Sequence, residues 1–113
     1  PHAATPFAHA PAGSIDLTLK LISIFRLMHP SALIPDTTAL ASLSSDGREQ
    51  GILAGANVVM PNLSPTSVRE KYTLYNQKAA FGSEAAEGLK LLEEQLNLIG
   101  YTISKERGDY NYV

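Results

Sequence analysis

Apolar residues in the first third of the chain recur at the spacing of a helix. Within residues 14–28 they form one stripe: Leu17, Leu21, Ile24, Phe25 and Met28. This periodicity predicts a helix that is capped by Ser14. The apolar residues at positions 15, 17, 19 and 21 alternate as in a strand, but the stretch is long for a strand and holds no Gly or Pro. We therefore favour the helix.

Two short apolar runs later in the chain predict buried strands. The first run, residues 32–35, is bounded by prolines, and the second, residues 57–60, is followed by one. Between them, residues 44–54 predict a short helix, because a Ser-Ser-Asp stretch offers an N-cap and Gly55 stands at the C-terminal glycine position.

Two further helices are predicted in the second half of the chain. Ser64 and Pro65 suit the cap and the first position of one of them. The last helix covers residues 83–99, where Leu residues and a final Ile share one face, and Gly100 follows it. The polar residues from 105 onward predict a loosely held terminus.

The order of these elements predicts an α/β fold. Helices that alternate with short apolar strands imply right-handed crossovers and a parallel sheet. Two strands do not complete such a sheet, and a full eight-stranded α/β barrel takes about 250 residues. We therefore expect a slice of a larger parallel fold that is mostly helical as an isolated chain. Its exposed strand edges would drive self-association.

Composition narrows the possible partners. The 113 residues, 44% of them hydrophobic, suit one domain with a modest core. The net charge of -2 provides no attraction for nucleic acid or an anionic membrane. The chain has no Cys, which excludes disulfides, thiolate nucleophiles and iron-sulfur ligation by this segment. Any metallocofactor would have to be held elsewhere.

The beginning of the chain predicts a piece of a longer protein. Pro1 stands in place of an initiator Met, and residues 1–11 read as a loop already under way. No basic and apolar blocks of a signal peptide are present, and no apolar run approaches the roughly 20 residues that cross a bilayer. We expect the parent protein to be cytoplasmic.

In a parallel α/β fold, the loops after the carboxyl ends of the strands build the active site. This rule selects residues 36–39 and residues 60–65. Their hydroxyl, amide and thioether groups suit contacts with a polar ligand rather than proton transfer. The histidines His2, His9 and His29 lack metal-ligand spacing, and we interpret them as surface or loop residues.

At these loops the sequence resembles the HydE-type radical SAM maturases, enzymes that help to assemble the active-site cluster of FeFe hydrogenases. The resemblance covers roughly the first eighty residues and is weaker in the last helix. Biotin synthase and methylornithine synthase, which are related radical SAM enzymes, share the Gly-Ala-Asn turn but not the whole continuation after it. The resemblance to the HydE-type maturases rests on five stretches: residues 1–7 (PHAATPF), 34–40 (IPDTTAL), 47–49 (GRE), 55–65 (GANVVMPNLSP) and 71–78 (KYTLYNQK).

The resemblance implies a TIM-type (β/α)8 barrel of which this chain is the C-terminal part. Residues 1–82 would supply the last two strands with their helices, and residues 83–113 a C-terminal helix and tail. The parent would bind S-adenosylmethionine and a 4Fe-4S cluster, and would act on a small-molecule substrate. Since the cluster-binding cysteines of the family are absent here, this chain alone could not cleave the cofactor.

The resemblance also implies roles for particular residues. Thr37 and Thr38 match a threonine pair that lines the cavity near the cofactor, and Met60 matches a methionine beside S-adenosylmethionine. Tyr72 and Tyr75 match tyrosines that face the cavity where the substrate or product sits. Asn62 is a further candidate for contact with the substrate. No catalytic residue and no metal ligand is expected in the chain.

Each of these residues also has an ordinary structural interpretation. The two threonines could satisfy backbone groups at a strand end, and Met60 could fill a gap in a core. Tyr72 and Tyr75, three apart on a helix, suit plain packing, and Asn62 suits a turn.

Three other features are interpreted structurally. Asn57 more plausibly fixes the turn into its strand than touches a ligand. The glycines at 47, 51 and 55 more plausibly allow close helix packing and end the helix. Arg48 and Glu49 would pair with neighbours or face solvent, and we do not expect them to be catalytic.

Three functions stay open from the sequence. The first is a cavity-forming part of a HydE-type maturase. The second is a related enzyme, such as methylornithine synthase or a biotin synthase-like enzyme. The third is a non-catalytic, self-associating structural module.

Overall fold

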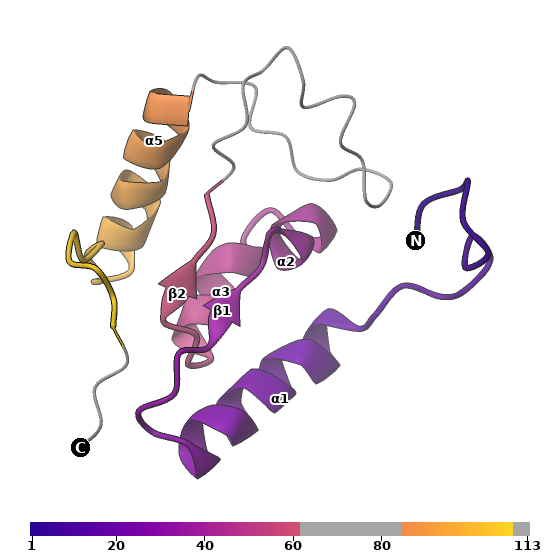
Figure 1. Cartoon of the computed structure of the whole chain (residues 1–113), viewed down its shortest axis with the longest axis horizontal. Coiled ribbons are helices and arrows are strands. Elements are labelled where there is room, and N and C mark those ends of the chain that lie inside the picture. Colours follow the sequence, from indigo (N-terminus) through magenta and orange to yellow (C-terminus); the bar gives the residue numbers. More distant parts are fainter. Residues whose placement is uncertain (62–84, 110–113) are drawn as a thin grey trace.

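A computed structural model describes residues 1–61 and 85–109 (Figure 1). The two strands pair in parallel, as the sequence predicts, and the barrel to which they would belong stays a prediction. The predicted helix from Ser64 lies outside the described residues. The described elements are α1 Ile15–Met28, β1 Pro35–Asp36, α2 Thr38–Leu43, α3 Gly47–Leu53, β2 Val58–Val59 and α5 Ala85–Leu98.

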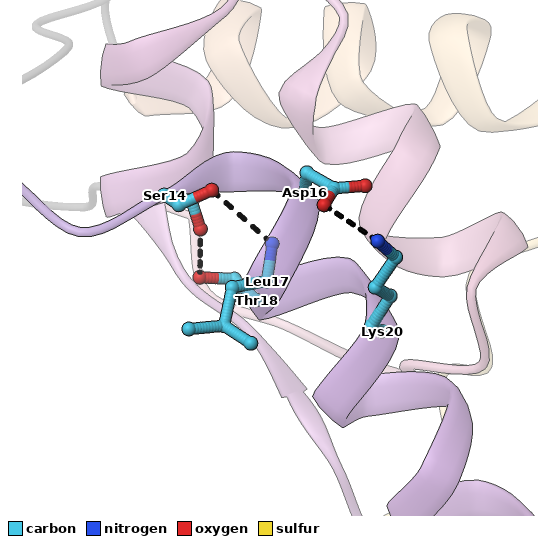
Figure 2. A network of polar contacts seen from close by, with 5 residues as sticks. All are labelled: Ser14, Asp16, Leu17, Thr18 and Lys20. Carbon is cyan, nitrogen blue, oxygen red and sulfur yellow. Dashed lines mark hydrogen bonds and ion pairs between the residues drawn. The ribbon is translucent and has the colours of Figure 1, made fainter.

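The first helix begins where the sequence predicts. The hydroxyl of Ser14 accepts a hydrogen bond from the Leu17 amide at 3.3 Å, and Thr18 Oγ1 donates to the Ser14 carbonyl at 2.8 Å (Figure 2). One turn on, Lys20 Nζ lies 2.8 Å from Asp16 Oδ2. These bonds satisfy groups at the amino end of α1, so the helix is confirmed and the strand alternative is wrong.

The face that α1 buries is not the predicted apolar stripe. Its buried residue is Ile22, whereas the residues of the stripe are between 42% and 64% exposed. The periodicity that predicts the helix therefore marks a face that the described residues leave uncovered. No helix in the described ranges is both long and apolar enough to cross a membrane.

The strand pair is shorter than predicted and begins later. Pro35 pairs with Val58 and Asp36 with Val59, so the first strand was placed too early at residues 32–35. Before it, the Ile34 amide donates to the Asn57 side-chain oxygen at 2.8 Å. The Ile34 carbonyl accepts from the Asn57 amide at 2.9 Å. Asn57 thus fixes the turn into β2, as predicted.

A short helix, α2, stands where the sequence predicts a loop. Thr37 is its N-cap and Leu40, which is 3% exposed, packs into the core. Gly47 lies against the Leu40 backbone so closely that a Cβ there would overlap the carbonyl. Packing against α3, rather than any periodicity in its six residues, accounts for this helix.

Two helices end on the predicted glycines. Gly55 after α3 has a φ of 121° and Gly100 after α5 a φ of 84°, values that favour glycine. At both ends the next residue reaches back into the helix, since Ala56 donates to the Gly51 carbonyl at 3.0 Å and Tyr101 to the Leu96 carbonyl at 2.9 Å. These are Schellman-type ends.

The core is small and draws on helices from both described ranges. Figure 1 shows α5 beside the strand pair, on the side away from α1. Partly buried residues such as Ile34, Val59 and Ile99 pack around the buried cluster. The buried hydrophobic residues are Ile22, Leu40, Ile52, Ala56, Leu92 and Leu96.

Candidate functional site

The carboxyl ends of the two strands bring two predicted cofactor contacts together. Asp36 and Val59 are paired in register, and the residues that follow them are Thr37 and Met60. Both strands run in the same direction, so these residues leave the sheet at one edge. We call Thr37, Thr38 and Met60 the strand-end edge. The register, which the sequence did not predict, places Thr37 beside Met60.

The threonines of the strand-end edge lie where a strand becomes a helix. Thr37 has extended backbone angles, and its exposed side chain makes no capping hydrogen bond to α2. Thr38 is the first residue of α2, and its carbonyl accepts from Ser42 Oγ at 2.9 Å. Thr37 is therefore the N-cap of α2 by backbone geometry, without a side-chain bond to the helix, while ligand contact by either threonine stays a prediction.

Met60 is not a core residue. It is 53% exposed directly after β2, so it fills no gap among the described core residues. Met60 and Thr37, which follow paired strand residues, are both exposed. The predicted substrate contacts Asn62, Tyr72 and Tyr75 lie outside the described residues.

A buried charge pair under this edge was missed by sequence reasoning. Asp36 is fully buried, and its Oδ2 lies 3.9 Å from Nε of Arg48, which is 4% exposed. The sequence left open whether Arg48 pairs with neighbours or faces solvent. The structure shows that it does not face solvent. A signal was present, because Asp36 ends an apolar strand and the glycines beside Arg48 permit close packing.

Burial controls the ionisation of Asp36. Loss of solvent raises the pKa of its carboxyl from 3.8 to about 6, against the lowering effect of the Arg48 charge. The nearby Glu49 adds to the rise. Within the described residues, neither Asp36 oxygen accepts a hydrogen bond. With a pKa of about 6, the Asp36 carboxyl changes its charge when the pH moves through the range around 6.

The glycines of α3 make this packing possible. A Cβ at Gly51 would stand 2.6 Å from Asp36 Oδ1 and 3.2 Å from Leu40 Cδ1. Gly47 meets the Leu40 backbone in the same way. The interpretation of these glycines as residues that allow close helix packing is confirmed, and Gly51 additionally makes room for the buried carboxylate.

Arg26 binds the opposite end of the strand pair. Its Nε donates to the Gly55 carbonyl at 2.8 Å and its Nη1 to the Pro30 carbonyl at 2.6 Å. Ser23 Oγ adds a bond to the Ala54 carbonyl at 2.9 Å. These contacts tie α1 to the segments that precede β1 and β2.

The described residues contain no group of three or more His, Asp or Glu side chains that could hold a metal ion. Hydroxyl groups donate and accept hydrogen bonds, and a thioether offers a polarizable apolar surface.

Comparison with known proteins agrees with the motifs of the strand ends. No known protein-family profile matches the chain. A curated relative, the FeFe hydrogenase maturase subunit HydE of Thermotoga maritima, is 33% identical over 108 residues. The sequence is of the HydE type. The match covers 96% of this chain but 31% of the HydE relative, so the chain spans about a third of that protein's length.

Proposed function

We propose that this HydE-type chain forms part of the cavity of a larger, cytoplasmic radical SAM enzyme that helps to assemble the FeFe hydrogenase cluster. The name of the relative, a hydrogenase maturase subunit, supports the process. The observation that carries the proposal is the register of the strands, which puts Thr37 beside Met60 at one carboxyl edge. In a parallel α/β fold, that edge is where ligands bind.

The residues of the strand-end edge fit S-adenosylmethionine. This cofactor has an ammonium, a carboxylate and ribose hydroxyls, which the hydroxyls of Thr37 and Thr38 would bind. Met60 would contact its apolar parts. Bound beside a reduced iron-sulfur cluster, S-adenosylmethionine supplies the radical that such enzymes use.

The iron-sulfur cluster itself does not fit this chain. The sequence has no Cys, and the described residues provide no group of three other ligands. We therefore place the cluster ligands in the part of the parent protein outside this chain. Within the chain, Tyr72, Tyr75 and Asn62 are proposed to contact the small-molecule substrate through their hydroxyl and amide groups.

The first test uses the intact parent protein. The reading frame upstream of this chain should encode a three-cysteine cluster motif. The purified and reconstituted protein should bind S-adenosylmethionine in equilibrium dialysis and cleave it under reducing conditions. A parent protein without the motif and without affinity for the cofactor contradicts the proposal.

The second test concerns the strand-end edge. Thr37→Val and Met60→Leu should each weaken the binding of S-adenosylmethionine by about threefold to tenfold, the loss expected for one polar or one packing contact. Thr18→Val and Met28→Leu, the same changes on α1, serve as matched controls and should leave affinity unchanged. Equal affinities in all four variants would remove the edge from the cofactor site.

The related enzymes are separated by their substrates. A methylornithine synthase would require a pocket for an amino acid, and a biotin synthase-like enzyme a different substrate again. Cleavage of S-adenosylmethionine that is stimulated by an amino acid substrate, with no support of hydrogenase maturation in a reconstituted assay, would favour the methylornithine synthase alternative over the HydE type.

One observation favours a second candidate, the self-associating module. Four of the exposed side chains on α1, Leu17, Leu21, Ile24 and Phe25, are between 42% and 56% exposed, a surface that soluble proteins usually cover. Sedimentation of the 113-residue chain should then show a concentration-dependent oligomer. A chain that stays monomeric would exclude the self-associating module. If the chain also binds no cofactor and is not ordered by the rest of the parent protein, the enzyme candidate is excluded as well.

A further inference from the structure

The burial of Asp36 and Arg48 requires an explanation. They are the buried charged residues of the described part of the chain, with exposures of 0% and 4%. Moving two charges out of water is costly, and such a pair seldom adds net stability compared with apolar residues of similar size. Fixing a particular arrangement is the better-supported use of a buried pair.

The pair joins the elements that border the strand-end edge. Asp36 is the last residue of β1 and immediately precedes Thr37. Arg48 lies in the first turn of α3, and its Nε is 3.9 Å from Asp36 Oδ2. Through Gly47 the same turn rests on the backbone of Leu40 in α2. A shift of α3 would therefore move both the end of β1 and the helix that Thr38 begins.

The contact leaves little freedom of movement. Gly51 lies one turn after Arg48 on the same face of α3, and a Cβ there would come within 2.6 Å of Asp36 Oδ1. With neither carboxylate oxygen hydrogen-bonded within the described residues, Arg48 is the cation that compensates the buried charge. The contact of α3 with the end of β1 thus includes this buried pair as well as the close approach at Gly51.

We propose that Asp36 and Arg48 are positioning residues, whose buried charge pair holds α3 on the end of β1 and thereby sets where Thr37 and Thr38 lie beside Met60. The inference deepens the proposed function and rests on it, because the strand-end edge is there the contact surface for S-adenosylmethionine.

The decisive measurement is amide hydrogen exchange on the intact parent protein. Asp36→Asn should speed exchange in residues 37–43 by about tenfold or more, since the variant lacks the buried ion pair between the end of β1 and α3. Exchange in α5 should stay as in the wild type, whereas a general loss of stability raises both. Asp16→Asn, the same change in an exposed ion pair of α1, is the control and should alter neither segment.

Two more variants separate positioning from simple filling of space. Arg48→Lys keeps the charge and should retain slow exchange in residues 37–43. Asp36→Ala combined with Arg48→Met removes both charges, and should unfold near the wild-type temperature yet keep fast exchange there. The proposal is overturned if residues 37–43 exchange at the wild-type rate in the double variant or in Asp36→Asn. If the double variant does not fold, Asp36→Asn and Arg48→Lys decide alone.

Binding of S-adenosylmethionine distinguishes this inference from the proposed function. If the wild type binds the cofactor, Asp36→Asn should weaken binding by about tenfold and Arg48→Lys by less. If Asp36→Asn exchanges faster as expected but the wild type binds no cofactor, the positioning role stands while the proposed function fails. A wild type that binds, with Asp36→Asn unchanged in exchange and affinity, leaves the function standing and overturns the positioning role.

Discussion

Arg26 and Gly55 are in direct contact across the interface between α1 and the turn into β2. Arg26 Nε donates to the Gly55 carbonyl at 2.8 Å, and a Cβ on Gly55 would stand 2.8 Å from Arg26 Cβ. The glycine also has a φ of 121°. The absence of a side chain at position 55 thus serves both the backbone angle and the approach of the arginine.

The first prediction concerns this contact. Gly55→Ala should lower the free energy of unfolding of the intact protein by about 2–4 kcal/mol, because strain at positive φ adds to overlap with Arg26. Thermal unfolding measures the loss. Gly108→Ala is the control, since its φ is 75° with nothing within 4 Å, and it should cost only the backbone part. Equal losses at both positions would argue against the contact.

The second prediction concerns Gly51 and Asp36. Gly51→Ala should destabilise the protein by about 1–3 kcal/mol, because its Cβ would overlap Asp36 Oδ1. Adding Asp36→Ala removes that oxygen, so the double variant should lose less than the sum of the two single losses. Urea unfolding of the four proteins gives the coupling. Gly13→Ala, at a site with nothing within 4 Å, is the control for the substitution itself.

The third prediction follows from the raised pKa of Asp36. Because the folded pKa, about 6, exceeds the unfolded 3.8, the folded state holds the proton more tightly. The stability from this group is fully present below pH 3.8 and is lost as the pH rises toward about 6, by about 3 kcal/mol in total. Burial is the main cause of the raised pKa, while the charge of Arg48 lowers the pKa and that of Glu49 raises it.

The measurement is urea unfolding at a series of pH values between 3.5 and 7. Asp36→Asn cannot titrate at this position, so the difference in stability between wild type and variant should change across that window. A wild type and an Asp36→Asn variant with parallel pH profiles would contradict the raised pKa.

The fourth prediction concerns Asn57. Asn57→Ala removes the acceptor of the Ile34 amide, a bond of 2.8 Å, and should cost about 1 kcal/mol. Asn57→Asp keeps an acceptor oxygen in the same place and should recover most of that stability. Chemical unfolding compares them, with Asn97→Ala on the exposed side of α5 as the control. Full stability in Asn57→Ala would show that the bond contributes nothing.

Local signals in the sequence predict much of the fold. Ser14 and Gly55 act on groups within a few residues of themselves, so the start of α1 and the end of α3 follow from residue type and spacing. Asn57 belongs with them, because an amide beside a strand start is a recognisable turn residue. By contrast, α2 carries no periodic signal, and only its contact with α3 reveals it.

Residue type and spacing alone predict the caps, the helical periodicity, the alternation of helix and strand and the HydE-type motifs, because each depends on neighbours along the chain. The tertiary structure alone decided the register that sets Thr37 beside Met60, the burial of Asp36 against Arg48, and which face of α1 is covered. Those depend on contacts between segments far apart in sequence, where close packing and loss of solvent, rather than local propensity, select the arrangement.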